Sequence, residues 1–293
     1  MSVSLRLAPF GTTIFAEMTK LALAHNAVNL AQGFPDFDGP EIAKSAAISA
    51  INAGHNQYAR MIGHPQLSAA IAETWRRRTG GTIDPDTRVT VTSGCTEAIA
   101  AVMLGLLNPG DEVVVFQPFY DSYRACIAMA SAIPKFVTLR PDGDGFAFDP
   151  AELEAAFTPR TRLLLINTPH NPTGKVFSRG ELSTIADACE RHGVIAVTDE
   201  VYEDLTYDDA RPHLHLATFP GMAERTITLS SLGKTHNLTG WKVGWAIAPP
   251  ELTAGIRAAH QFLTFATATP LQLGAAAVLR GDRAHVGGTR DLF

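Results

Sequence analysis

The sequence predicts an α/β protein built on a mostly parallel sheet. From about Thr82 to Ala248, short apolar runs alternate with helical patterns, and that alternation is typical of parallel strands joined by helices. The apolar runs are β-branched or wholly apolar, as expected for strands that are covered on both faces. A length of 293 residues, with 46% hydrophobic and 18% charged residues, is sufficient for one large buried core.

The strands and helices are expected in alternating order. The expected strands are residues 88–92, 112–116, 135–139, 162–167, 194–198, 225–229 and 243–247. The expected helices are residues 41–53, 66–79, 96–107, 121–132, 179–192, 250–265 and 271–280. Residues 281–290 are rich in glycine and show no periodicity, so we expect this segment to be frayed or disordered.

Composition and charge exclude several classes of function. The net charge is −5, and Arg76 to Arg78 is the longest basic run, which gives no electrostatic case for nucleic-acid binding. No apolar stretch is long enough to cross a membrane, and the N-terminus lacks the apolar run of a signal peptide. Cys95, Cys126 and Cys189 are far apart and odd in number, which predicts no disulfide framework, no metal site and a cytoplasmic protein.

Polar residues follow several of the expected strands, at the edge of a parallel sheet where ligands bind. The turn from Ser93 to Thr96 connects a strand to a helix, and free amides at such a turn bind phosphate well. Asp199 closes an almost wholly apolar strand, so its carboxylate needs a partner such as a heterocyclic cation. The plainer alternative for Ser93 to Thr96 is an ordinary strand–helix turn. For Asp199 it is an N-cap of the turn that follows the strand.

Three further residues complete this group. Tyr120 offers an aromatic face, although a tyrosine at the edge of the core would look the same. Asn171 is a donor in a turn that contains two X-Pro bonds. Lys234 lies in a loop of small and polar residues, eight positions before Lys242, a setting that suits a Schiff base with an aldehyde. These residues suit a phosphate, an aromatic ring, a ring cation and an aldehyde. Pyridoxal 5′-phosphate carries all four groups, so the residues together predict this cofactor.

The chain resembles the fold-type I pyridoxal-phosphate aminotransferases of class I/II. The motifs that carry the resemblance are Asn171-Pro-Thr-Gly174, Asp199-Glu-Val-Tyr202 and Ser231-Leu-Gly-Lys234 followed by Lys242. Residues 29–37, Asn56-Gln-Tyr58 and 260–265 resemble the kynurenine/glutamine and methionine aminotransferases within that family. The resemblance covers about residues 10 to 280 and implies a three-layer α/β/α large domain.

The resemblance also implies a role for each candidate residue. Lys234 would form the Schiff base and carry the proton, and Asp199 would pair with the ring nitrogen. Tyr202 and Asn171 would bond the ring 3-oxygen, and Tyr120 would stack on the ring. The phosphate would be held by Gly94, Cys95, Thr96, Ser231 and Lys242.

Two pocket residues and one partner residue follow from the same resemblance. Gly33 and Phe15 would line the substrate pocket together with Asn171. Tyr58 would reach the phosphate of a neighbouring subunit, which implies a homodimer with shared active sites.

The resemblance divides the chain into three parts. These are an N-terminal segment at residues 1–40, a cofactor-binding large domain at 41–265 and the start of a C-terminal region at 266–293. The family binds the substrate carboxylate with an arginine of its small domain, and Arg280, Arg283 and Arg290 lack that arginine's context. We therefore expect the small domain to be incomplete in this sequence.

The predicted function is an exchange of an amino group between an amino acid and a 2-oxo acid. The expected amino acid has a large apolar or aromatic side chain, like that of methionine, glutamine or kynurenine. Two alternatives stay open: a C–S β-lyase that uses the same site, and a cofactor-binding remnant that is catalytically impaired.

Overall fold

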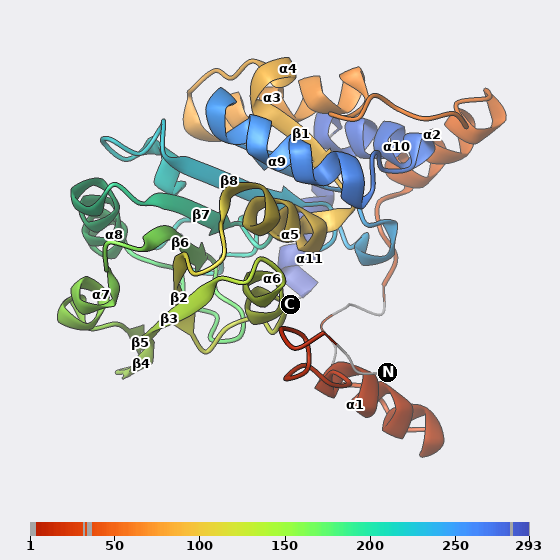
Figure 1. Ribbon diagram of the computed structural model, residues 1–293. Helices are drawn as coiled ribbons and strands as arrows, with labels where there is room; N and C mark the ends of the chain where they lie inside the picture. Colours follow the sequence, from red (N-terminus) through yellow and green to blue (C-terminus); the bar gives the residue numbers. More distant parts are fainter. Residues whose placement is uncertain (1–3, 32, 34–36, 282–283, 293) are drawn as a thin grey trace.

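The core of the protein is a seven-stranded, mostly parallel sheet (Figure 1). The computed structural model describes residues 4–31, 33, 37–281 and 284–292. In spatial order the strands are β1 (Val89–Thr92), β9 (Gly244–Ile247), β8 (Thr226–Ser231), β7 (Ile195–Asp199), β6 (Thr161–Asn167), β2 (Glu112–Gln117) and β3 (Ile133–Thr138). The pairs from β8 to β3 are parallel, whereas β9 runs antiparallel to both β1 and β8. The predicted sheet is confirmed, with strand ends shifted by a residue or two.

Helices cover both faces of this sheet, so the predicted three-layer architecture is also confirmed. Along β2, Val113 and Val115 belong to one core cluster, whereas Val114 and Phe116 belong to the other, as the two-residue period of a strand requires. The first face packs against α5 (Gly94–Leu106), α6 (Ser122–Met129) and α9 (Pro250–Leu263). The opposite face packs against α7 (Pro150–Ala156), α8 (Arg179–His192), α2 (Glu41–Asn52), α3 (Pro65–Thr79) and α10 (Thr269–Arg280).

Local signals explain where these helices begin and end. Ser178 and Glu181 form a reciprocal capping box at the start of α8, and Gly193 ends that helix in the left-handed conformation. Such caps satisfy backbone groups that a helix terminus leaves unpaired. Among the described residues, no helix is long and apolar enough to span a membrane.

Several elements were not expected from the sequence. They are α1 (Ile14–Ala24), α4 (Pro85–Arg88), α7, the hairpin of β4 (Arg140–Asp142) and β5 (Gly145–Ala147), and the 3-10 turns η1 (Leu216–Thr218) and η2 (Thr239–Trp241). Most are short, so they offer too few residues for a periodic pattern to emerge. Helix α1 has no buried residue, and Figure 1 shows it standing apart from the sheet.

The expectation of a frayed segment at residues 281–290 is wrong. Helix α11 spans Ala284–Leu292 despite two consecutive glycines, which have poor helix propensity. Tertiary contacts outweigh that propensity here. His285 lies 2.6 Å from His236 between ring nitrogens, and Val286 is buried. The division of the chain at residues 40 and 265 stays a prediction.

Candidate active site

The ends of the strands surround a cavity of about 550 Å³. Ten of the predicted cofactor residues line it: Gly94, Cys95, Thr96, Tyr120, Asn171, Asp199, Tyr202, Ser231, Lys234 and Lys242. They come from the turns after β1, β2, β6, β7 and β8, and from the segment before β9. The sheet therefore brings together residues that lie as much as 148 positions apart in the chain.

The first turn of α5 forms one wall of this cavity and suits an anion. Gly94 opens the helix with a φ of +75°, and amides at a helix N-terminus attract negative charge. The ammonium of Lys242 lies beside it, because a Cβ placed on Gly94 would be 3.2 Å from Lys242 Nζ. Ser231 lines the same cavity from the end of β8.

The buried His260 stabilises the same turn through Glu97. The carboxylate of Glu97 accepts the Ser93 N–H at 2.9 Å and lies 3.0 Å from His260 Nδ1. The other ring nitrogen of His260 lies 2.9 Å from the carbonyl of Met61. Helix α9 is thus tied to the entry of α5 through one carboxylate.

We expect His260→Gln to lower the free energy of unfolding by about 1–3 kcal/mol, because it removes a buried partner of Glu97. Burial opposes protonation of His260, yet the hydrogen bond and charge of Glu97 hold its pKa above the ordinary value. The protonated pair therefore stabilises the fold fully below about pH 6.5, the unfolded-state pKa, and less as pH rises through the folded-state value. Denaturant unfolding at pH 6 and pH 9 measures this difference.

The matched control is His25→Gln, which changes an exposed histidine at the end of α1. A destabilisation by His260→Gln that stayed equal at both pH values would contradict the role of the charged pair.

Asp199 lines the cavity and is almost fully buried. Its Oδ2 accepts the hydroxyl of Tyr123 at 2.7 Å, and its Oδ1 accepts the Val201 N–H at 3.3 Å. Burial raises the pKa of Asp199, although the bonds from Tyr123, Val201 and Cys95 oppose that shift. The bond from the Val201 N–H agrees with the N-cap interpretation, but it does not account for the whole environment of Asp199. The buried carboxylate also faces a cavity, where a cationic group would stabilise its charge.

Two residues that orient this site were not singled out from the sequence. Tyr123 is buried on α6, three residues after Tyr120. This spacing, which places two residues on one side of a helix, was the only feature of the sequence that could have indicated Tyr123. Asn167 ends β6, where its side chain donates to the carbonyl of Asp199 at 2.8 Å and accepts the Asn171 N–H at 2.6 Å. An asparagine that closes an apolar strand could have been chosen on the same grounds as Asp199.

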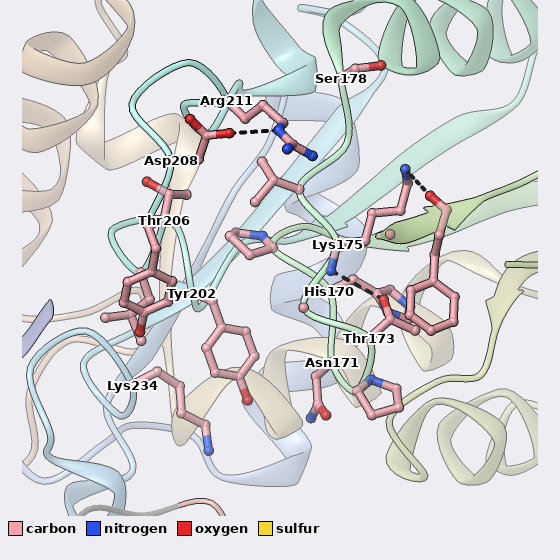
Figure 2. A pocket seen from close by; sticks show the side chains of 18 of the residues that line it. His170, Asn171, Thr173, Lys175, Ser178, Tyr202, Thr206, Asp208, Arg211 and Lys234 are labelled. Carbon is pink, nitrogen blue, oxygen red and sulfur yellow. Dashed lines mark hydrogen bonds and ion pairs between the residues drawn. The ribbon is translucent and has the colours of Figure 1, made fainter. Parts of the chain in front are cut away.

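Lys234 reaches the cavity from the loop after β8. Its Nζ lies 3.3 Å from the carbonyl of Gly33 and 5.7 Å from the ring centre of Tyr202. Burial lowers the pKa of Lys234, Asp199 opposes that shift, and Lys242 adds to it. Figure 2 shows Lys234, Tyr202 and Asn171 ending around one common space. An amine of lowered pKa in such a space suits attack on a carbonyl and proton transfer.

Two larger cavities adjoin this space. One of about 790 Å³ is lined by Phe10, Phe15, Gly33, Tyr120 and Asn171, so all three predicted pocket residues share a cavity with Lys234. The other, about 1120 Å³, is shown in Figure 2 and has a polar wall. Lys175 and Arg211 belong to that wall, and each is paired with a carboxylate of its own, Glu181 at 2.7 Å and Asp208 at 2.8 Å.

Some predicted residues lie away from these cavities. Tyr58 lines none of the three; this residue is 86% exposed, and its ring meets that of Phe265 edge-on at 5.5 Å between centroids. Arg280 pairs with Glu73 at 2.8 Å, and Arg290 lies 3.6 Å from Asp209. Arg283 falls outside the described residues, as do Gln32, Phe34, Pro35 and Asp36 of the 29–37 motif.

Comparison with known proteins identifies close relatives. The sequence model of the aminotransferases of class I and II matches residues 25–291. A probable N-succinyldiaminopimelate aminotransferase of Mycobacterium tuberculosis is 53% identical over 99% of this chain and 73% of its own length. The solved structure of N-succinyldiaminopimelate aminotransferase from that organism superimposes with a TM-score of 0.97 at 52% identity, covering 99% of this chain and 76% of that one.

Two further relatives are named for other activities. The methionine aminotransferase of Escherichia coli is 41% identical over 98% of this chain and 74% of its own length. Its structure gives a TM-score of 0.94 at 40% identity, covering 100% of this chain and 76% of that one. Kynurenine–oxoglutarate transaminase 1 of Rattus norvegicus is 38% identical over 98% of this chain and 70% of its own length.

Proposed function

Because this chain belongs to the aminotransferases of class I and II and is a pyridoxal-phosphate-dependent enzyme, we propose that it moves the amino group of an amino acid with a large apolar or aromatic side chain to a 2-oxo acid. One observation carries the choice of side chain. The cavity beside Lys234 includes Phe10, Phe15 and Tyr120 among its lining residues, and aromatic lining favours apolar groups.

The cavity at the strand ends has a partner for each polar group of pyridoxal 5′-phosphate. The turn at Gly94 and the ammonium of Lys242 suit the phosphate. The buried carboxylate of Asp199 suits a protonated ring nitrogen, since burial without a cation raises its pKa. Tyr120 offers an aromatic face, and Lys234 offers the amine. The residues present therefore fit this cofactor.

The proposed chemistry divides between the cofactor and the side chains around it. The bound cofactor carries the amino group between the two substrates and delocalises negative charge from the substrate Cα. Asp199 would keep a proton on the ring nitrogen, with its carboxylate held by the hydroxyl of Tyr123 at 2.7 Å. Tyr202 and Asn171, which line the same cavity (Figure 2), would donate hydrogen bonds to the ring 3-oxygen.

Lys234 is the proposed acid and base of the reaction. It would first bind the cofactor through Nζ, and then move a proton between the substrate Cα and the cofactor. Burial and the neighbouring Lys242 both lower the pKa of Lys234, which increases the fraction of neutral amine near pH 7. A base whose pKa lies nearer the working pH transfers protons more effectively.

We expect Gly244→Ala to weaken binding of pyridoxal phosphate. A Cβ at Gly244 would lie 2.6 Å from the carbonyl carbon of Gly94 and 2.7 Å from the backbone nitrogen of Cys95, so the phosphate turn must shift. Such overpacking costs about 1–3 kcal/mol, or roughly 5- to 140-fold in the dissociation constant. Titration of the apoenzyme with cofactor, followed by absorbance, measures the change.

The matched control is Gly180→Ala in α8, because no atom lies within 4 Å of a Cβ at that position and Gly180 does not line the cavity. Equal affinities of the Gly244 variant and the parent would show that the turn does not hold the phosphate.

A second candidate donor has a long side chain that ends in a carboxylate. The specific observation is the polar wall of the larger cavity, where Lys175 and Arg211 lie (Figure 2). A donor carboxylate would there compete with Glu181 and Asp208, their present partners. The relatives named for N-succinyldiaminopimelate support this candidate as well. Cationic side chains are the usual partners of a terminal carboxylate.

The deciding experiment compares donors in the half-reaction without an oxo acid. L-methionine, L-kynurenine, L-glutamine and N-succinyl-L,L-diaminopimelate are each mixed with holoenzyme, and absorbance follows conversion of the bound cofactor to its amine form. The main proposal expects methionine or kynurenine to react with the highest kcat/KM. A highest value for N-succinyldiaminopimelate would favour the second candidate, and no conversion by any of the four would overturn both.

The lyase alternative is tested in the same assay with an S-substituted cysteine. Transamination yields the amine form of the cofactor without free pyruvate, whereas β-elimination releases pyruvate and leaves the cofactor unchanged. Pyruvate release faster than conversion would replace the aminotransferase proposal with a lyase.

We also propose a homodimer with shared active sites. Tyr58 is 86% exposed and lines none of the three cavities of its own subunit, which leaves it available to a partner's site. Helix α1 presents Ile14, Leu21 and Leu23 to solvent, and exposed apolar surface of this kind is typical of an interface. Three unpaired cysteines support a cytoplasmic location.

A further inference from the structure

One polar cluster lies on the far side of the sheet from Cys95 and Tyr123. Along β8, Ile227 and Leu229 point into the apolar core, whereas Thr226, Thr228 and Ser230 alternate with them and so face the opposite side. That side holds Glu200, Glu203, His213 and His215, here called the Glu/His cluster. It follows directly after Asp199 in sequence but takes no part in the proposed reaction.

The four side chains of the cluster converge on one point. One ligand atom from each lies within 4.8 Å of all the others. Glu200 Oε2 is 3.0 Å from His213 Nε2 and 2.5 Å from His215 Nδ1. A tetrahedral zinc ion with bonds of about 2.1 Å separates its ligand atoms by roughly 3.4 Å. The cluster therefore needs only small side-chain movements to surround such an ion.

Two atoms of the cluster are buried without a hydrogen-bond partner among the described residues. They are Glu200 Oε1 and His213 Nδ1. The side chain of Glu200 is fully buried, and that of His213 is 5% exposed. A buried carboxylate oxygen without a partner is costly. A second ligand bond from Glu200 to a cation would satisfy it.

The charge around the cluster also favours a divalent cation. Glu200, Glu203 and Asp204 carry negative charge, and Arg78 offsets one of them through contacts of 2.5 Å to Glu203 and Asp204. With both imidazoles neutral, two negative charges are left in excess. Arg290 lines the adjoining cavity but lies 3.6 Å from Asp209, which offsets its charge.

An ion can reach the cluster from outside. A cavity of about 560 Å³ is lined by Glu203, His213 and His215 on one side and by Val286 and Gly287 of α11 on the other. A metal site needs such an entry path as well as its ligands.

We propose that Glu200, Glu203, His213 and His215 bind one divalent cation of the zinc class. Two imidazoles and two carboxylates are a ligand set that suits Zn²⁺. The cation would fix the segment between β7 and η1, and so the loop that carries Tyr202. The spacing of the cysteines predicted no metal site, whereas these four ligands lie within a 16-residue segment that contains no cysteine.

The competing explanation is a hydrogen-bonded trio in which two histidines neutralise Glu200 without a metal. Metal content separates the two. Holoenzyme is treated with EDTA, dialysed against micromolar ZnCl₂ and analysed by mass spectrometry for zinc and sulfur. We expect about one zinc per chain. His213→Gln and His215→Gln should each weaken zinc binding by more than the roughly 10- to 100-fold known for outer-shell partners.

The matched control is His192→Gln, which removes a histidine at the end of α8 that pairs with Glu154 at 2.7 Å, stacks on Phe157 and does not belong to the Glu/His cluster. This variant should keep one zinc per chain. Retained cofactor absorbance and an unchanged circular dichroism spectrum show that each cluster variant is folded.

A second readout avoids variants altogether. Co²⁺ replaces Zn²⁺ in such sites and gives intense visible absorbance when it is tetrahedral, so the EDTA-treated parent should develop these bands on addition of CoCl₂ and lose them on addition of ZnCl₂. The proposal is overturned if the parent binds no zinc at micromolar concentration. It is also overturned if His213→Gln and His215→Gln bind zinc as tightly as the parent does.

Discussion

Lys234→Ala should abolish transamination while the protein still folds. Lys234 Nζ opens into the cavity at the strand ends, 3.3 Å from the carbonyl of Gly33, and it is the proposed acid and base. Loss of positioned proton transfer alone lowers the rate by roughly 10²- to 10⁴-fold, and loss of the covalent anchor adds to that. The half-reaction with the best amino donor, followed by absorbance under single-turnover conditions, measures the effect.

Reductive labelling identifies the lysine independently of activity. Borohydride treatment of the parent holoenzyme should attach the cofactor permanently to the peptide that contains Lys234. The control is Lys242→Gln, which should weaken cofactor binding but leave the label on Lys234, because Lys242 lies at the phosphate turn. A label on another lysine, or tight binding without any covalent link, would contradict the assignment of Lys234 as the lysine that binds the cofactor.

Asp199→Ala should weaken cofactor function far more than it harms folding. Its carboxylate is buried and faces the position proposed for a ring cation. Removing one partner of a buried charge pair costs about 3–5 kcal/mol, or roughly two to nearly four powers of ten. The measurements are the dissociation constant of pyridoxal phosphate and the rate of the half-reaction, with thermal unfolding of the apoenzyme as the test of folding.

Tyr123→Phe is the matched control for Asp199. It removes the hydroxyl that donates to Asp199 Oδ2 but leaves the carboxylate in the cavity, so its effect should be smaller, near the 1.5–3 kcal/mol of a hydrogen bond to a charged group. If Asp199→Ala bound cofactor and reacted like the parent, Asp199 would be only the cap that bonds the Val201 N–H.

The large regular elements could be predicted because pattern and burial agree in them. The strand at residues 162–167 is wholly apolar apart from its ends and is buried on both faces. The short α7 and the helix α11 could not be predicted, because seven residues show little periodicity and Gly287 and Gly288 argue against a helix. Contacts with residues that are distant in sequence determine whether such segments form helices.

The candidate site divides in the same way. Residues at strand ends, such as Asp199 and Ser231, could be placed because parallel strands end at one edge of the sheet. Tyr123 and His260 act from inside helices, where a buried polar residue looks like any other position of the pattern. Their roles depend on hydrogen bonds to Asp199 and Glu97, which no spacing in the sequence encodes.

The place of β1 at the edge of the sheet has a consequence for synthesis on the ribosome. Its partner in the sheet is β9, and 152 residues separate Thr92 from the paired Gly244. At about 5–20 residues per second, the ribosome needs roughly 8–30 s to add them. All four residues of β1, two valines and two threonines, are buried in the finished fold, so through that interval the nascent chain exposes this strand without its neighbour. We expect this strand to be where the growing polypeptide most needs a chaperone.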